Sequence, residues 1–368
     1  MKIKTITCHN VYNVGASLQA YALTAYLTGL GHEVQIVDYV PEYLRHYKLW
    51  TGVSSPAYDK PVIRQLYNLA KLPGRLKDLG SLRKKRFDRF TREYLPLTET
   101  HYGSYEMLLR DPPKADVFLA GSDQIWNSFF SNGRDPAFYL QFAPKGAIRA
   151  SYAASFAVPR LEEQYREQTA AWIRALDHVS VRESSALKIL EDLGVEGGVG
   201  VVDPVFLLTK DQWDALCPPV DFGEPYILVY DFDNNPELRR IAGTLAAERN
   251  WKIYSIQKLD YCDRSFWDGG PIEFVQLVRG AKFVLSNSFH ATAFSLIYQR
   301  PYLTVDREMG INTRMQDLNR LVGLEHRKKP DDPIDWEDVQ ARLEQHITGS
   351  KAYLQTVIDA MKGSCHDR

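Results

Sequence analysis

The stretch Gly280-Ala-Lys-Phe-Val-Leu-Ser-Asn-Ser-Phe-His-Ala-Thr-Ala-Phe-Ser-Leu-Ile-Tyr298 decides how the rest of the sequence is interpreted. Its residues 283–285 form a short apolar run typical of a buried strand, and the polar residues 286–288 are good helix N-cap candidates. Apolar residues then recur with helical spacing from 289 to 297. The pattern predicts a strand that leads directly into a helix, with His290 in the first helical turn.

His290 is the candidate catalytic residue of this stretch. Open α/β sheets bind ligands at the carboxyl ends of their strands, where a helix start favours an anionic ligand and a neutral imidazole. A neutral histidine can act as a base, and as an acid once it is protonated. A single histidine more often packs or caps, so the weight of this hypothesis depends on the rest of the chain.

The composition is typical of a globular protein with more than one domain. A chain of 368 residues is too long for one ordinary core, and the net charge of -1 argues against bulk nucleic-acid binding. The four cysteines lie far apart without a CxxC pair, which favours neither a zinc site nor a disulfide framework and predicts a cytoplasmic location. The polar start is too short for a signal peptide, and no run approaches ~18 apolar residues, so we expect no membrane span. We also expect no required metal or cofactor.

Strand and helix patterns alternate along the first half, which predicts a parallel sheet. Residues 3–7 and 33–37 are the first two expected strands, and a helix over 18–27 lies between them. The loop before this helix contains Gly15 and ends at an expected cap, Ser17. This βαβ unit lacks GxGxxG, so no dinucleotide is implied, but its loop suits an anion or a sugar hydroxyl as well as it suits a plain turn.

The segment Gly121-Ser-Asp-Gln-Ile-Trp-Asn127 directly follows an expected strand over 116–120. Asp and Gln beside Trp are the residues with which sugar sites bond hydroxyls and stack against the apolar face of a ring. A helix capped by Ser122 or Asp123 over a packed Trp126 explains the segment equally well.

Arg182 lies at another strand-to-helix junction, after a short expected strand over 178–181. An arginine in this position can clamp a carboxylate or phosphate with two hydrogen bonds. A surface ion pair with Glu183 or another neighbouring residue is the alternative.

Residues 42–110 are the least regular part of the sequence, with a strong basic excess from 60 to 93 that is concentrated in Arg83-Lys-Lys-Arg86. Apolar residues interleave with these charges, which predicts an amphipathic helix. Its basic face is either solvated or in contact with an anionic surface. The second interpretation predicts peripheral contact with the inner face of the membrane.

The second half repeats the alternation, with expected strands over 226–230, 252–256 and 301–305 and helices over 312–321 and 336–361. We therefore predict an α/β fold with two Rossmann-like domains that face a cleft. The expected boundaries are 1–210 for the N-terminal domain, with a basic helical insert at about 42–110, 222–330 for the C-terminal domain and 331–368 for C-terminal helices.

Taken together, these motifs resemble the polysaccharide pyruvyltransferase family. Each piece is weak alone, but the pieces follow one another in order over about residues 1–325. They are residues 13–23, 38–39, 116–127, 152–156, 179–183, 203–207, 270–274, 286–291 and 311–314.

The resemblance implies a GT-B-like architecture and the transfer of pyruvate from phosphoenolpyruvate to a sugar, as a cyclic ketal on two hydroxyls. The acceptor would be a surface polysaccharide or its lipid-linked precursor. His290 would be the acid/base. The implied donor-binding residues are Arg182, Ser288, Phe289 and Arg314, and the implied acceptor-binding residues are Asn13, Gly15, Ser17, Gln19, Ser122, Asp123, Gln124 and Trp126.

The chain departs from the family pattern at Ser288, because characterised branches often carry arginine two residues before the histidine. Arg314 or Arg307 would have to replace that charge.

Two other functions stay open, because fold analogy alone cannot choose among them. A glycosyltransferase of the same architecture would use a nucleotide sugar, but the C-terminal half shows no clear Glu-x7-Glu-like pattern. A non-catalytic glycan-binding protein would not need both His290 and Arg182.

Overall fold

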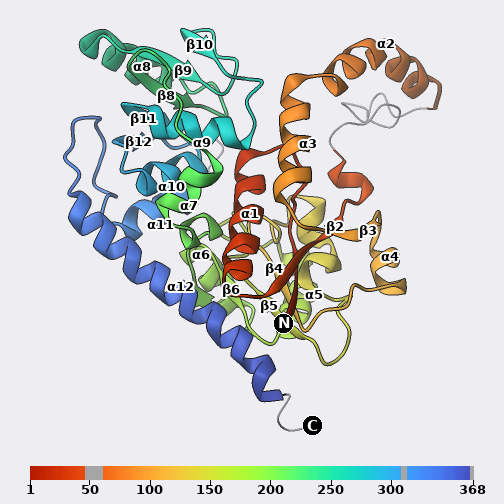
Figure 1. Cartoon of the computed structure of the whole chain (residues 1–368). Coiled ribbons are helices and arrows are strands. Elements are labelled where there is room, and N and C mark those ends of the chain that lie inside the picture. Colours follow the sequence, from red (N-terminus) through yellow and green to blue (C-terminus); the bar gives the residue numbers. More distant parts are fainter. Residues whose placement is uncertain (46–60, 308–312, 365–368) are drawn as a thin grey trace.

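Two five-stranded sheets form the framework of the protein in the computed structural model, which describes residues 1–45, 61–307 and 313–364 (Figure 1). Parts of the 42–110 insert and of the 311–314 motif, the expected helix start at 312, and residues 365–368 lie outside the described residues.

The first sheet is entirely parallel, with strand order β3-β2-β1-β4-β5. Its strands are β1 (Lys2–Ile6), β2 (Glu33–Tyr39), β3 (Leu97–Tyr102), β4 (Val117–Ala120) and β5 (Ile148–Ser151). The short pair β6 (Ser180–Val181) and β7 (Val199–Gly200) lies beside β5. Central β4 is buried along its whole length, as expected for a parallel strand covered on both faces.

The second sheet is also parallel, and its order β10-β9-β8-β11-β12 repeats the first. Its strands are β8 (Tyr226–Tyr230), β9 (Lys252–Ser255), β10 (Arg264–Ser265), β11 (Phe283–Ser286) and β12 (Tyr302–Thr304). In both sheets the first strand is central and the order reverses beside it, which is the Rossmann pattern. The prediction of two Rossmann-like sheets in a GT-B-like arrangement is confirmed.

Helices connect the parallel strands and cover the sheets (Figure 1). They are α1 (Val14–Gly29), α2 (Pro61–Leu79), α3 (Leu82–Tyr94), α4 (Tyr105–Arg110), α5 (Glu163–Arg174), α6 (Ser184–Asp192), α7 (Lys210–Leu216), α8 (Pro236–Arg249), α9 (Pro271–Gly280), α10 (Phe289–Ile297), α11 (Thr313–Leu321) and α12 (Trp336–Ser364). Short 3-10 turns are η1 (Glu42–Leu44), η3 (Ser131–Arg134), η4 (Pro136–Tyr139) and η5 (Pro204–Leu207).

The cap of α1 is Asn13 rather than the expected Ser17. The Asn13 side chain accepts hydrogen bonds from the backbone N–H groups of Gly15 and Ala16, at 2.9 and 3.2 Å. The helix therefore begins at Val14, and this earlier start moves Gly15 from the loop into the first helical turn.

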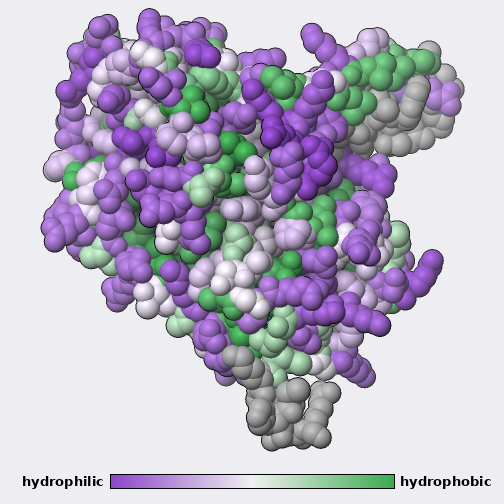
Figure 2. Space-filling model, in the orientation of Figure 1, coloured by the Kyte–Doolittle hydropathy of each residue, from purple (hydrophilic) through white to green (hydrophobic). Residues whose placement is uncertain are grey.

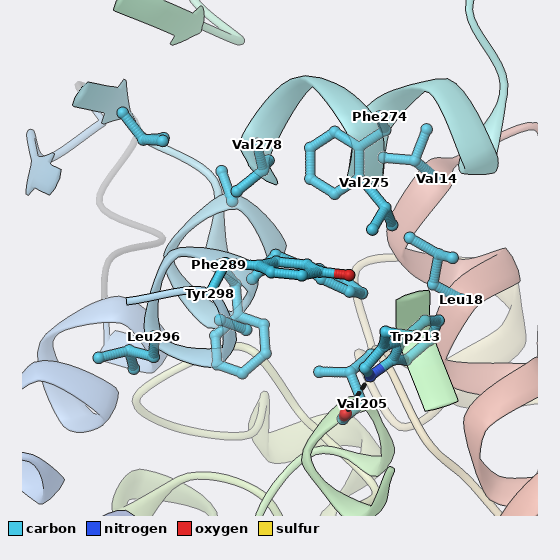
Figure 3. Close-up of a cluster of buried hydrophobic side chains, with 14 of the residues drawn as sticks. Val14, Leu18, Val205, Trp213, Phe274, Val275, Val278, Phe289, Leu296 and Tyr298 are labelled. Atoms are coloured by element: carbon cyan, nitrogen blue, oxygen red, sulfur yellow. Dashed lines mark hydrogen bonds between the residues drawn. The ribbon is translucent and has the colours of Figure 1, made fainter. Parts of the chain in front are cut away.

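One hydrophobic cluster passes from the first sheet to the second. Val14 and Leu18 of α1 face Phe274 and Val275 of α9 in Figure 3, with Trp213 beside them. The predicted domains thus share a core that holds the carboxyl ends of both sets of strands near each other. Helix α12 extends this connection, because its first half packs in the same cluster and its second half packs against the first sheet (Figure 1).

The basic segment forms two helices, α2 and α3, rather than one. Ser81 caps α3, whose Phe87 and Phe90 enter the shared core, while α2 projects from the body of the protein (Figure 1). None of the described helices is long and apolar enough to cross a membrane. β3 and α4 lie in the segment where the sequence showed no regular pattern, because both are only six residues long.

Candidate active site

His290 lies in the first turn of α10, directly after β11, as the sequence predicted. Ser288 caps this helix by accepting a hydrogen bond from the backbone N–H of Ala291. The imidazole is buried, and its Nε2 lies 3.7 Å from a carboxylate oxygen of Asp203. Within the described chain this buried nitrogen has no hydrogen-bond partner.

Gly15 packs against His290 from the opposite sheet. A Cβ atom at position 15 would lie 2.0 Å from the imidazole Nδ1, which is far inside van der Waals contact. Only glycine therefore lets the first turn of α1 approach the imidazole this closely.

Arg182 is a buried bridge rather than half of a surface pair with Glu183. Its side chain is 2% exposed, and its guanidinium lies 2.5 Å from Asp203 and 3.4 Å from Asp123. The guanidinium also lies over the ring of Phe289, 4.6 Å from the centroid. Glu183 is also buried, with its carboxylate 3.9 Å from the Arg182 Nε, and it accepts hydrogen bonds from the Ser155 hydroxyl and the Ala157 N–H.

Arg314 reaches the same cluster from α11. It is 8% exposed, and its closest ionic contact is with Asp123, at 3.6 Å. Its Nε has no hydrogen-bond partner among the residues that the structure describes. Burial, and then the charge of Arg182, lower the pKa of Arg314 to about 10, so it remains a cation at neutral pH. A buried cation with so little pairing is positioned to receive an anion.

The charges of the cluster also set the protonation of its acid and base. Burial would raise the pKa of Asp123, but the charges of Arg182 and Arg314 hold it below its ordinary value. Burial lowers the pKa of His290, and Asp203 and Asp123 offset only part of this effect. At neutral pH the cluster therefore contains ionised Asp123 and a neutral imidazole.

A pocket of about 370 Å³ opens onto the two arginines, large enough for a small anionic molecule. Asp203 and Phe289 line it, together with His346 of α12. No described group of three or more His, Cys, Asp or Glu side chains is placed to hold a metal ion.

Ser122 and Gln19 hold the loop that carries Asp123. The Ser122 N–H donates to the Gln19 side chain at 3.1 Å, and the Ser122 hydroxyl donates to the Ala153 carbonyl. Gln19 in turn donates to the hydroxyl of Thr7. These polar groups bond to one another in the interior, and so they fix the position of Asp123.

Trp126 lies apart from the cluster, in the core under the first sheet. Its ring is fully buried, stacks on Tyr139 with centroids 5.3 Å apart, and donates its N–H to the Phe138 carbonyl. The face on which a sugar would stack is therefore covered by Tyr139. Gln124 bonds to Asn127, and no helix in the described chain begins within 121–127 for Ser122 or Asp123 to cap.

The structure thus brings together His290, Arg182, Phe289, Arg314, Asp123 and Gly15. Asn13, Ser288 and Ser17 serve the starts of α10 and α1, and Ser17 is buried there. Sequence reasoning missed Asp203, which joins Arg182 to His290. An aspartate directly before a proline is typical of a helix cap, and the Asp203 side chain does accept a hydrogen bond from the Val205 N–H at the start of η5. This local sequence signal does not reveal the ionic partners of Asp203.

Comparison with known proteins identifies one family. The family model described as polysaccharide pyruvyl transferase matches residues 13–308. None of the curated proteins matches the chain.

Solved structures that resemble this chain share little of its sequence. The UDP-GlcNAc 2-epimerase from Methanocaldococcus jannaschii in complex with UDP-GlcNAc and UDP has a TM-score of 0.48 and 12% identity over 94% of this chain and 93% of its own. Arabidopsis thaliana UGT89C1 has a TM-score of 0.49 and 12% identity over 99% of each chain. The E. coli heptosyltransferase WaaC with ADP has a TM-score of 0.39 and 12% identity over 85% of this chain and 90% of its own. Likeness at this level decides nothing about activity.

Proposed function

We propose, from the premise that the chain belongs to the polysaccharide pyruvyl transferase family, that this transferase uses phosphoenolpyruvate as donor and forms a cyclic ketal on two hydroxyls of a sugar. The observation that carries the proposal is the weakly paired, buried guanidinium of Arg314 beside a neutral His290. Phosphoenolpyruvate presents two anionic groups and an enol carbon that must be protonated, and this pair of residues suits both requirements.

The donor's charges would fall mainly on Arg314. Arg182 already has Asp203 at 2.5 Å, so much of its charge is neutralised, whereas the closest carboxylate to Arg314 is 3.6 Å away. Arg314 therefore replaces the charge that the family pattern would place at Ser288, while Phe289 and Arg182 position the donor.

His290 would move a proton between the two substrates. The neutral imidazole accepts the proton of a sugar hydroxyl through Nε2 and delivers it to C3 of the donor, while the sugar oxygen bonds to C2. Phosphate then leaves with the electrons of its C–O bond. A second hydroxyl attacks C2, and its proton goes to the phosphate, which completes the ketal. The guanidinium groups stabilise the anionic donor throughout.

The acceptor would enter on the side of α1 and Asp123. Gly15 and Asp123 are the acceptor candidates in the cluster, and Asn13, Ser17, Gln19, Ser122 and Gln124 support them from the surrounding loops. Glycan acceptors present many hydroxyls, which an ionised Asp123 can bind as a hydrogen-bond acceptor.

A lipid-linked acceptor would require contact with the membrane, and we place that contact on α2. Leu69 and Leu76 are 57% and 53% exposed, and Figure 2 shows hydrophobic surface on this projecting helix. Its sequence carries Arg64, Lys71, Arg75 and Lys77 against a single acid, Asp78. The sequence predicts this contact over 60–93; because Arg83 and Arg86 of α3 bond to the loop before α9, we propose α2 as its centre.

Binding calorimetry on Arg314→Gln tests the donor. Losing a charge-assisted contact should weaken phosphoenolpyruvate binding by about 10- to 100-fold. Arg342→Gln is the control, because Arg342 of α12 is an exposed arginine that pairs with Asp338 and does not line this pocket, so binding should not change. A protein that ignores phosphoenolpyruvate and binds a nucleotide sugar through Arg314 would instead be the glycosyltransferase.

A further inference from the structure

The pocket of about 370 Å³ is built from segments that lie far apart in the sequence. Residues from the start of α6, from α11, from the C-terminal helix α12 and from the β7–η5 segment line it, and Figure 1 shows α12 passing beside α11 and α6. Arg314 lies at the inner end, because it is only 8% exposed, whereas His346 of α12 is a solvent-exposed residue at the outer end. Phe289, which directly precedes His290, also lines the pocket. The pocket therefore connects the catalytic helix to an imidazole on α12.

A buried serine one turn further along α12 fixes the backbone at His346. The Ser350 hydroxyl donates to the His346 carbonyl at 2.7 Å and accepts the Val202 N–H at 2.9 Å. Val202 directly precedes Asp203, which pairs with Arg182. Residues four apart lie on the same face of a helix, so His346 is on the face of α12 that is held against the site.

Several hydrogen-bond donors of this pocket already have partners. The hydroxyl and the backbone N–H of Ser184 both donate to Asp317, at 2.9 and 2.8 Å, so the start of α6 already has an anion. Arg320 donates to the same carboxylate at 2.8 Å. Arg182 lies 2.5 Å from Asp203. These groups have little capacity left for a bound anion.

Two side-chain donors remain, Arg314 and His346. The Arg314 Nε has no hydrogen-bond partner in the described part of the chain. The imidazole of His346 makes no hydrogen bond, ion pair or ring contact with any residue that the structure describes. Burial lowers the pKa of His346, so at neutral pH the ring is neutral and has one N–H to donate.

We propose that His346 binds the phosphate of the donor while Arg314 binds its carboxylate. This inference rests on the proposed function and assigns a further residue to the same site. Phosphoenolpyruvate carries two anionic groups, and one guanidinium cannot pair with both of them bidentately. The phosphate is the group that leaves, so it belongs at the outer end of the pocket beside the exposed His346. The carboxylate stays with the product and belongs at the buried end beside Arg314.

Binding calorimetry with phosphoenolpyruvate on two substitutions of His346 tests the proposal. His346→Leu removes the N–H and should weaken binding by about tenfold. His346→Gln keeps an N–H donor, so its affinity should stay within about threefold of the wild type. His326→Leu is the matched control, because His326 is also an exposed histidine but does not line the pocket, so binding should not change. All three variants change exposed residues and should keep the melting temperature of the wild type.

Two fragments of the donor identify the group that His346 contacts. Inorganic phosphate and pyruvate are used as competitors of phosphoenolpyruvate in the same titrations. The affinity for phosphate should fall about tenfold in His346→Leu, whereas the affinity for pyruvate should not change. Weaker pyruvate binding with unchanged phosphate binding would overturn the assignment of the phosphate.

Two further results would overturn the inference and leave the proposed function in place. One is phosphoenolpyruvate binding that His346→Leu does not weaken although Arg314→Gln does. The other is an equal loss in His346→Leu and His346→Gln, which would show that the shape of the imidazole matters and its hydrogen bond does not. A wild-type protein that does not bind phosphoenolpyruvate would overturn the proposed function together with this inference.

Discussion

Gly15 and His290 show how a single residue contact can control the site. The imidazole is positioned by its own helix on one side and by the first turn of α1 on the other. Arg182 has a comparable role among the charges, because it lies between two carboxylates, those of the buried Asp203 and the half-buried Asp123. Its removal would leave both acids without their closest cation, so Arg182→Ala would disturb folding as well as donor binding.

Replacing Gly15 by alanine should abolish most of the activity while leaving the fold intact. The added Cβ would displace the imidazole, and a shift of about 1 Å in a reacting group costs about 10²-fold in rate. Overpacking should lower the free energy of unfolding by about 1–3 kcal/mol. Kinetics and urea denaturation measure the two effects.

Gly29→Ala, in the same helix, is the control for this change. A Cβ at position 29 has no atom within 4 Å, so activity should not change. Equal activity of both variants would show that His290 does not need its present position.

The rate should fall on acidification through the pKa of His290. Burial lowers that pKa below its ordinary value of 6.5, and the proposed base is the neutral form. kcat/KM should therefore be level at neutral pH and decline only as the pH falls below 6.5. His290→Asn should remove this limb from the pH profile together with most of the activity. A rate that rises on acidification would instead show that the protonated imidazole of His290 carries out the first step.

At the scale of elements, the neighbouring helices α2 and α3 have different partners. Arg86 of α3 bonds to Asp268 and Glu273, so this helix ties the insert to the second sheet. α2 continues beyond this attachment, and its Leu69 and Leu76 are 57% and 53% exposed. The basic residues of one sequence segment are thus divided between an internal interface and a projecting surface.

Charging the apolar face of α2 should abolish binding to anionic vesicles. Leu69→Asp with Leu76→Asp removes two exposed leucines that the proposed contact would bury in the bilayer, which should weaken vesicle binding by at least about tenfold. Cosedimentation with phosphatidylglycerol vesicles measures this, and added salt should weaken the wild type.

Leu109→Asp on α4 serves as the control, because Leu109 is also 53% exposed but lies away from the basic helix. Vesicle binding that survives the double substitution would leave α2 without a membrane role.

At the scale of the whole molecule, the two sheets are joined by a common core rather than by a linker. α1 from the first sheet, α9 and α10 from the second, and α12 all contribute to it. This arrangement positions the carboxyl ends of both sheets, from which His290 and Arg182 extend. The domain boundaries at 1–210 and 222–330 stay a prediction, and one hydrophobic cluster contains residues from both ranges.

The shared core should make thermal unfolding a single cooperative transition. Differential scanning calorimetry should give one peak whose calorimetric and van't Hoff enthalpies agree. Two resolved peaks would mean that the two sheets unfold independently and that the shared cluster contributes little to stability.

The sequence by itself determined the alternation of strands and helices, the parallel sheets and the position of His290 at a strand-to-helix junction. These features depend on local periodicity and on caps, which neighbouring residues encode. The strand Tyr226–Tyr230 and the start of α12 at Trp336 follow their patterns to the residue.

Only the tertiary structure decided which side chains meet. Asp203 pairs with Arg182, Gly15 touches His290, and Trp126 lies in the core under Tyr139. A Trp beside Asp and Gln has the same local pattern whether it faces a sugar or the interior. Burial and the pairing of buried charges depend on segments that are distant in sequence, and their approach is set by the packing of the two sheets around one core.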